Sequence, residues 1–206
     1  MPENTDIQPG TTPQATQVAA APAGDTYAIS PMISRFTVKV TATGLLSAFG
    51  HSPTIQIRDL NGEIRFSPQT VEQSSLHLVV RADSLTVADN ISDKDRREIE
   101  SQMREQVLET SKYTEIVYDS QSVSVKSPAD AQGDVILLGQ LTLHGVTRPQ
   151  KVPARITVTG DLLRAFGEFS LRQSDYNIKP VSAVGGGLKV KDEVTFTFDI
   201  AARKQA

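Results

Sequence analysis

Val194-Thr195-Phe196-Thr197-Phe198-Asp199-Ile200, near the C-terminal end of the chain, shows the clearest alternation of apolar and polar side chains. An extended backbone points successive side chains to opposite faces, so this segment has one apolar and one polar face. One-sided alternation favours an antiparallel sheet, because parallel sheets are usually covered on both faces. The segment therefore predicts an antiparallel strand that packs against a core on one side.

The same alternation recurs along most of the chain after Tyr27. It is strongest in residues 35–42, 63–66 and 76–81, and further strand candidates cover residues 54–58, 115–126, 134–143, 151–159 and 161–172. Turn-forming residues stand at Asn61-Gly62, Gly133-Asp134 and Thr159-Gly160-Asp161. The pattern predicts about eight or nine strands joined by turns.

One segment, from Ser92 to about Thr110, has a different period. It contains neither Gly nor Pro, and Ser92-Asp93-Lys94-Asp95 resembles a capping box at its start. Ile99, Met103 and Val107 are spaced by four and form a narrow apolar stripe beneath a charged face. We expect one amphipathic helix here.

Together these elements predict an all-β fold, an eight-stranded antiparallel barrel with one amphipathic helix as a lid or plug. A chain of 206 residues suits one such domain, and no linker to a second domain is visible.

Residues 1–25 differ from the rest of the chain. They contain four prolines, three acidic side chains and no Lys or Arg, so they cannot bury enough apolar surface to fold. We expect a disordered tail at 1–25 and a folded domain at 26–206. The tail lacks the basic start and apolar core of a secretory signal, which predicts a cytoplasmic location.

Composition excludes several classes of protein. The chain has no Cys and a formal charge of −3, so it lacks thiolate chemistry and the basic excess of a nucleic-acid binder. No apolar run is long enough for a transmembrane helix. Motifs of hydrolases, phosphate loops and zinc proteases are absent, and Gly185-Gly186-Gly187-Leu188-Lys189 is interpreted as a loop before a strand. No catalytic residues are predicted.

The three histidines are candidates for polar or metal-binding roles. His77 lies on the polar face of its strand, whereas His51 and His144 lie at strand ends. Their wide spacing argues against joint metal ligation, and we expect no metal. His51 and His144 are candidates for the rim of the barrel. Arg96 and Arg97 are candidates for an anionic headgroup, or simply part of a solvated helix start.

A nine-residue segment resembles the signature of a known family. Leu141-Thr142-Leu143-His144-Gly145-Val146-Thr147-Arg148-Pro149 resembles the L-T-L-H-G-V-T-[KR]-P motif of the YceI-like family. Residues 27–38 are similar to the family's opening strands. Lys112–Ile116 with Ser120 resembles its K-Y-P-x-I…S segment, with Thr114 in place of proline. The resemblance covers residues 26–203.

The resemblance implies a lipocalin-like barrel that encloses a long apolar ligand, a polyisoprenoid or another amphiphilic lipid, with no catalytic residues. It also implies a periplasmic location if a leader has been removed, because members are often exported. The chain departs from the family at Asp95–Ile99, which lacks the histidine of R-D-x-H-L. A headgroup role there loses support.

Strand parity assigns inward positions that would contact a ligand. They are Phe36, Val38, Val40, Ile57, Ile64, Phe66, Leu78, Val80, Leu141, Phe169, Phe196 and Phe198. An eight-stranded barrel either fills with side chains or holds one small ligand, and composition does not distinguish the two. The resemblance favours the hollow alternative.

Three functions therefore stay open at the level of sequence. The first is a carrier that binds an isoprenoid or fatty-acid-like lipid and needs no other cofactor. The second is a metal- or redox-linked protein that uses His51 and His144, and the third is a stress-related interaction module without a ligand. The oligomeric state, including a homodimer, is open.

Overall fold

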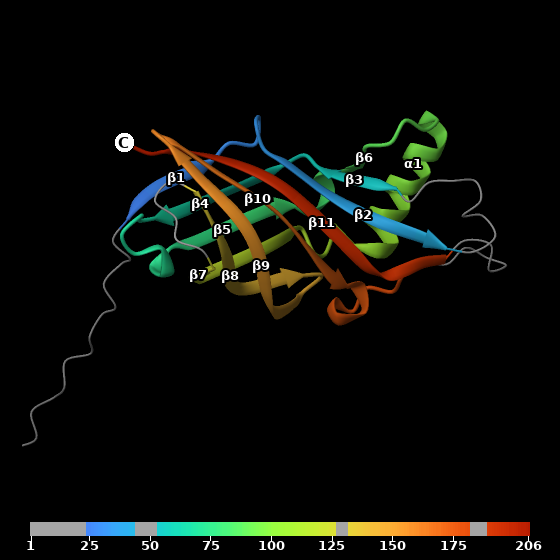
Figure 1. Ribbon diagram of the computed structural model, residues 1–206. Helices are drawn as coiled ribbons and strands as arrows, with labels where there is room; N and C mark the ends of the chain where they lie inside the picture. Colours follow the sequence, from blue (N-terminus) through green and yellow to red (C-terminus); the bar gives the residue numbers. More distant parts are fainter. Residues whose placement is uncertain (1–23, 44–52, 127–131, 182–188) are drawn as a thin grey trace, which may run out of the picture.

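The strand β11 (Lys189–Lys204) contains the alternating segment and organises the barrel in the computed structural model (Figure 1). One edge of β11 pairs with β10 (Leu162–Arg172), and the other edge pairs with β2 (Arg35–Thr43) and then β1 (Asp25–Ile29), all antiparallel. Val194, Phe198 and Ile200 are buried, as their parity predicts. The structure describes residues 24–43, 53–126, 132–181 and 189–206.

The described residues form eleven strands and one main helix. The other strands are β3 (Thr54–Ile57), β4 (Leu60–Phe66), β5 (Ser75–Arg81), β6 (Leu85–Val87), β7 (Glu115–Val125), β8 (Gln132–Leu143) and β9 (Val146–Thr159). The helix α1 (Asp93–Gln102) continues into a π-helical turn, η4 (Met103–Val107). Short 3₁₀ turns are η2 (Val71–Gln73), η3 (Ala82–Ser84) and η5 (Gln173–Tyr176).

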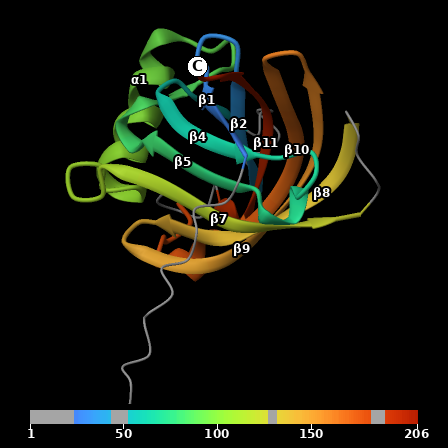
Figure 2. The same ribbon diagram turned by 90° about the vertical axis from the view of Figure 1, so that its left-hand side faces the viewer.

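Eight strands close the barrel. They follow the order β1-β4-β5-β7-β8-β9-β10-β11, and the pairing of β1 with β11 closes the ring. Figure 2 shows these strands wrapping around a common interior. The predicted eight-stranded antiparallel barrel with one amphipathic helix is confirmed.

The three further strands, β2, β3 and β6, extend strands of the ring. β1 leads into β2 across Ser30–Ser34, β3 leads into β4 across Arg58-Asp59, and β5 leads into β6 across η3. β2 pairs with β3, and β3 pairs with β6, so these three strands continue the barrel wall beyond β11. β7 pairs with β5 and has no pairing with β6 among the described residues. The barrel is therefore split at this end.

The helix α1 covers the free edge of β6. The backbone N–H of Val87 donates to the Glu100 carboxylate at 3.0 Å, and the Arg96 guanidinium donates to the carbonyl oxygens of Val87 and Asp89. Ser92 caps the helix, since its hydroxyl accepts the backbone N–H of Asp95 at 3.1 Å. Side chains of α1 thus replace the strand that β6 lacks, because buried backbone groups require hydrogen-bond partners.

These bonds predict different effects for two adjacent arginines. Arg96→Ala removes two charge-assisted bonds, one to Val87 in β6 and one to Asp89 just beyond it, and should lower the free energy of unfolding by about 2 kcal/mol. Arg97, which is exposed, is the matched control, and Arg97→Ala should change stability by less than about 0.5 kcal/mol. Urea denaturation of both variants measures the difference. Equal effects would show that Arg96 does not hold the helix.

Two of the predicted turns are wrong. Asn61-Gly62 lies inside β4, where a Cβ on Gly62 would collide with the carbonyl oxygen of His77. This glycine allows close backbone approach and does not mark a turn. Gly133-Asp134 lies inside β8, and the Asp134 carboxylate accepts a hydrogen bond from Arg155 of β9 at 2.6 Å. The third turn is correct, since Gly160 has a left-handed φ of 56° between β9 and β10.

Several sequence predictions fall outside the described residues. They concern residues 1–23 of the expected tail, His51, and the glycines of the 185–187 loop. Asp25, assigned to the tail by composition, is the first residue of β1 and forms an ion pair with Lys204 at 2.7 Å.

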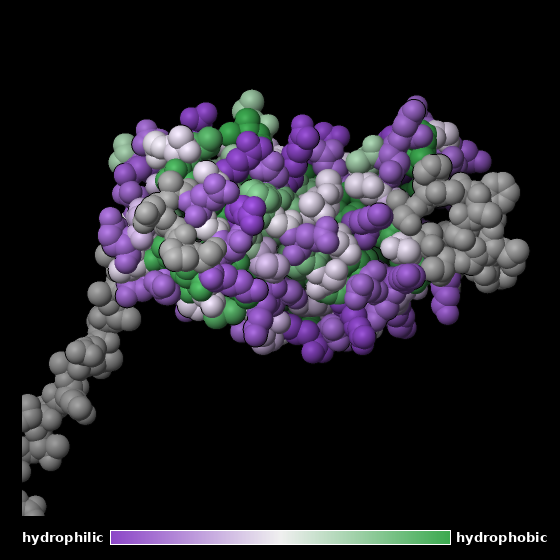
Figure 3. Space-filling model, in the orientation of Figure 1, coloured by the Kyte–Doolittle hydropathy of each residue, from purple (hydrophilic) through white to green (hydrophobic). Residues whose placement is uncertain are grey.

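The outer surface shown in Figure 3 is mainly hydrophilic. Within the described ranges, no helix combines the length and apolar character needed to cross a bilayer. Most of the large apolar side chains belong to the buried core, whereas Met32, Ile33, Leu138 and Phe166 are exposed.

Candidate functional site

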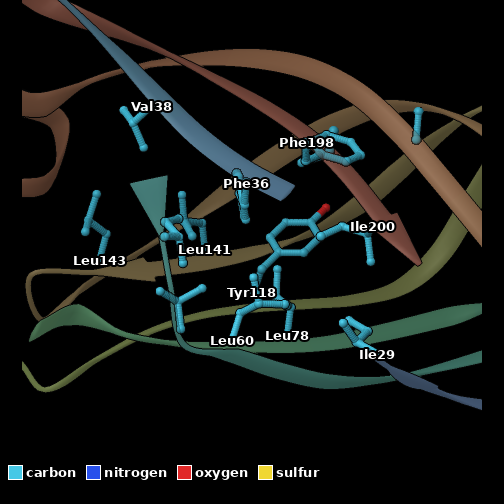
Figure 4. Close-up of a cluster of buried hydrophobic side chains, with 14 of the residues drawn as sticks. Ile29, Phe36, Val38, Leu60, Leu78, Tyr118, Leu141, Leu143, Phe198 and Ile200 are labelled. Atoms are coloured by element: carbon cyan, nitrogen blue, oxygen red, sulfur yellow. The ribbon is translucent and has the colours of Figure 1, made fainter. Parts of the chain in front are cut away.

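The interior of the barrel is hollow. A cavity of about 130 Å³, here called the barrel cavity, is bordered by inward side chains of the closed ring. Figure 4 shows side chains from several strands, among them Phe36, Leu141 and Phe198, converging on this interior. Seven inward apolar side chains stay only partly buried: Ile64, Leu76, Ile116, Leu137, Ala165, Phe169 and Phe196. Their incomplete burial is what unfilled space predicts.

A second cavity of about 280 Å³, here called the helix cavity, lies between the split end of the barrel and the helix. Ile99, Met103 and Val107, the predicted apolar stripe, line it. Among the described residues, its polar lining consists of Asp89, Gln102 and Gln173. The helix thus closes a hollow end of the barrel and does not fill it.

The two cavities adjoin each other. Ile57, Ile116, Leu143 and Phe196 line both of them. These shared side chains lie between the two spaces, and the two adjoining, mostly apolar cavities are together called the apolar path here.

All twelve positions assigned to a ligand by strand parity border this path. Val38 and Val40 line the helix cavity, and Ile57 and Phe196 line both cavities. The remaining eight line the barrel cavity: Phe36, Ile64, Phe66, Leu78, Val80, Leu141, Phe169 and Phe198. Their contact with a ligand stays a prediction.

Other lining residues were not assigned from the sequence. Ile29, Val135 and Ile156 lie in alternating segments, so the same parity argument would have included them. Val71 and Ser74 lie in and next to the 3₁₀ turn η2, where strand parity gives no signal. Strand parity could therefore have found the three strand residues, but it could not have found the residues from the turn.

Three polar side chains are among the described residues that border the barrel cavity, those of Ser74, Ser75 and Tyr118. The Tyr118 hydroxyl lies 3.1 Å from the carbonyl oxygen of Gln150 and 3.3 Å from that of Leu137. Burial raises the pKa of Tyr118 to about 12, so this phenol is neutral at physiological pH. The Ser74 hydroxyl is buried and has no hydrogen-bond partner among the described residues. The wall of the cavity is almost wholly apolar, and no charged side chain from the described ranges borders it.

His144 forms part of a hairpin turn. Leu143 of β8 pairs with Val146 of β9, and both intervening residues are left-handed, with φ of 51° at His144 and 73° at Gly145. Two left-handed residues make the tight turn that matches the twist of a β-hairpin. A Cβ on Gly145 would lie 2.6 Å from the Tyr113 ring, so the position requires glycine. The His-Gly pair of the nine-residue signature is thus explained by the turn.

The His144 ring holds neighbouring segments together. Nε2 lies 2.8 Å from the Glu109 carboxylate, and Nδ1 lies 3.2 Å from the carbonyl oxygen of Tyr176. The Tyr113 ring is 4.3 Å away between centroids. His144 lines neither cavity, and its side chain is only 9% exposed. It links the segment after the helix to η5, at the end of the barrel that the helix covers.

The other rim candidates lie in different environments. Arg96 donates to backbone carbonyls at the end of β6, so the structure gives it a structural task. Arg97 is exposed on the helix and lines neither cavity. His51 lies outside the described residues. None of the described rim candidates borders the path.

No metal centre is visible in the described part of the chain. It contains no group of three His, Cys, Asp or Glu side chains that could hold a metal ion. His77 is exposed on the outer face, as expected, and its Nδ1 lies 2.6 Å from the Asp119 carboxylate. Whether His51 and His144 act together stays untested.

Comparison with known proteins gives a consistent picture. The model of the YceI-like domain matches residues 27–202. A curated relative, a UPF0312 protein of Shewanella baltica, is 26% identical over 130 residues, and the chain spans 63% of that relative's length.

Solved structures resemble the fold. BcnA of Burkholderia cenocepacia superposes with a TM-score of 0.68 at 14% identity, covering 84% of this chain and 98% of its own. A polyisoprenoid binding domain of Saccharophagus degradans, implicated in plant cell wall breakdown, gives 0.64 at 14% identity, with 87% and 98% covered. At these identities the likeness establishes the architecture.

Proposed function

Because this chain belongs to the YceI-like domain family, we propose that it is a binding protein that encloses a polyisoprenoid or a similar amphiphilic lipid in its barrel. The observation that carries this proposal is the apolar path formed by the barrel cavity and the helix cavity. The polyisoprenoid binding domain of Saccharophagus degradans has the same architecture and supports the class of ligand.

Burial of the ligand's apolar surface would drive binding. Transfer from water contributes about 25 cal/mol per Å² of apolar surface, before the cost of ordering the ligand is subtracted. A long hydrocarbon gains most from an enclosed path, because each added segment is buried on all sides. The half-buried inner side chains Phe169 and Phe196 would be covered by the same event.

The polar lining favours an uncharged polar end on the ligand. The helix cavity is bordered by one carboxylate, Asp89, and two carboxamides, Gln102 and Gln173. A carboxylate repels an anionic headgroup such as a phosphate, whereas carboxamides can donate to and accept from a hydroxyl or a carbonyl. We place the ligand's polar end in the helix cavity and its chain toward the barrel cavity.

A binding role without catalysis agrees with the groups in the path. Catalysis by acid–base or nucleophilic steps needs a reactive group held beside an activating partner. The described polar groups are hydroxyls, carboxamides and Asp89, whose carboxylate accepts the backbone N–H of Thr54 at 2.7 Å. These groups can orient a ligand.

Mass spectrometry of the purified protein tests the proposal. Native spectra, recorded after mild purification, should show an added mass, and organic extraction should release a neutral lipid with a long hydrocarbon chain. Incubation of the delipidated protein with a polyprenol should restore the added mass, and the matching polyprenyl phosphate should bind more weakly. Failure of every polyprenol and fatty-acyl probe to bind would overturn the proposal.

A further inference from the structure

Phe196 stands between the two cavities. It is the only aromatic side chain among the four that line both. Its ring stacks on Phe169, with centroids 4.9 Å apart and planes inclined by 5°, and it meets Phe36 edge-on at 6.1 Å. Phe169 and Phe36 line the barrel cavity alone. The aromatic contacts of Phe196 therefore come from the barrel side.

Phe196 is also the shared side chain best placed to move. Ile57 and Leu143 are buried, whereas Phe196 and Ile116 are only partly buried. The backbone of Phe196 is held between Phe169 on β10 and Val38 on β2. An opening between the two cavities at Phe196 must therefore come from rotation of its side chain. Rotation of Ile116 would open less space, because its side chain is smaller than the ring of Phe196.

We infer that Phe196 sets the length of hydrocarbon chain that the protein accepts. This inference rests on the proposed function, since it assumes that a lipid enters the barrel. A short chain fits in the helix cavity, of about 280 Å³, and leaves the ring stacked on Phe169. A long chain reaches the barrel cavity only when the ring turns aside, which loses the stacking contact but buries more hydrocarbon.

Variants at this position test the inference. Phe196→Ala removes the ring that lies between the two cavities, and Phe196→Trp replaces it with a larger ring. Phe166, on the outer face of β10, gives the matched control Phe166→Ala. Each protein is delipidated, checked for folding by circular dichroism, and titrated with farnesol, geranylgeraniol and solanesol in native mass spectrometry.

The measured quantity is the ratio of solanesol binding to farnesol binding. We expect this ratio to rise at least about tenfold in Phe196→Ala, to fall by about as much in Phe196→Trp, and to stay unchanged in Phe166→Ala. If Phe196→Trp does not fold, Phe196→Leu must give a ratio between those of the parent and Phe196→Ala. An unchanged ratio in the Phe196 variants would overturn the inference, while binding by the parent would leave the proposed function standing. A parent that binds no probe would overturn both.

Discussion

Phe169→Glu should reduce lipid binding at least about a hundredfold, because a bound hydrocarbon would bury the new carboxylate without a partner. Phe169 lies on the inner face of β10 and borders the barrel cavity. Its side chain is only partly buried, so the substitution leaves the surrounding core largely in place. Retention of a polyprenol in native mass spectrometry measures the loss, after circular dichroism has verified the fold.

The control for this prediction lies on the same strand. Phe166 is 45% exposed on the outer face of β10, and Phe166→Glu should bind lipid like the parent. The pair therefore compares one substitution on the two faces of a single strand. If folded Phe169→Glu bound the polyprenol as tightly as Phe166→Glu, the ligand would not occupy the barrel, and the lipid-binding proposal would have to be abandoned.

Gly167→Ala should lower the free energy of unfolding by about 2–3 kcal/mol, which is typical of an overpacked interior. A Cβ at this position would lie 2.8 Å from the ring of Phe198 and would collide with the carbonyl oxygen of Pro153. The carbonyl belongs to β9 and cannot move without disturbing the sheet. Strand propensity alone predicts the opposite sign, because glycine weakens a strand interior.

Gly160→Asn is the control for the glycine prediction. Gly160 lies in the β9–β10 turn with a φ of 56°, and a Cβ there meets nothing within 4 Å. Asparagine tolerates left-handed conformations, so this variant should lose less than about 1 kcal/mol. Urea denaturation of both variants measures the difference. A Gly167→Ala protein as stable as the parent would show that the Pro153 carbonyl and the Phe198 ring can shift to accept the added methyl group.

The candidate site was only partly predictable. Strand parity placed Phe36, Phe169 and Phe196 on the inner face, and all three border a cavity. Arg96 was a rim candidate, either for a headgroup contact or as part of a solvated helix start, and it donates to the backbone carbonyls of Val87 in β6 and Asp89 beyond it. The sequence shows that the side chain is charged, but its partner depends on which strand of the folded sheet has an edge without a neighbouring strand. Which edges stay unpaired is decided by strands from distant parts of the chain.

The nine-residue signature illustrates the same limit. From the sequence, His144 stood at a strand end with a polar ring that suited the rim or a metal. In the folded chain the ring lies between Glu109 and Tyr176, which are separated from it by 35 and 32 positions. The turn itself was foreseeable from Gly145, whereas the contacts of the ring were not.

By itself, the sequence determined nine of the eleven strands, their inner faces, the antiparallel pairing and the single helix, whereas β1 and β6 were not predicted. These properties depend on the period of the side chains along one segment, and period two or a spacing of four is visible in any short stretch. The tertiary structure alone decided that the barrel is hollow, that it is split beside β6, and that Phe196 lies with three other side chains between its two cavities. Cavity volume depends on the distance between opposite walls, and residues far apart in the chain set that distance.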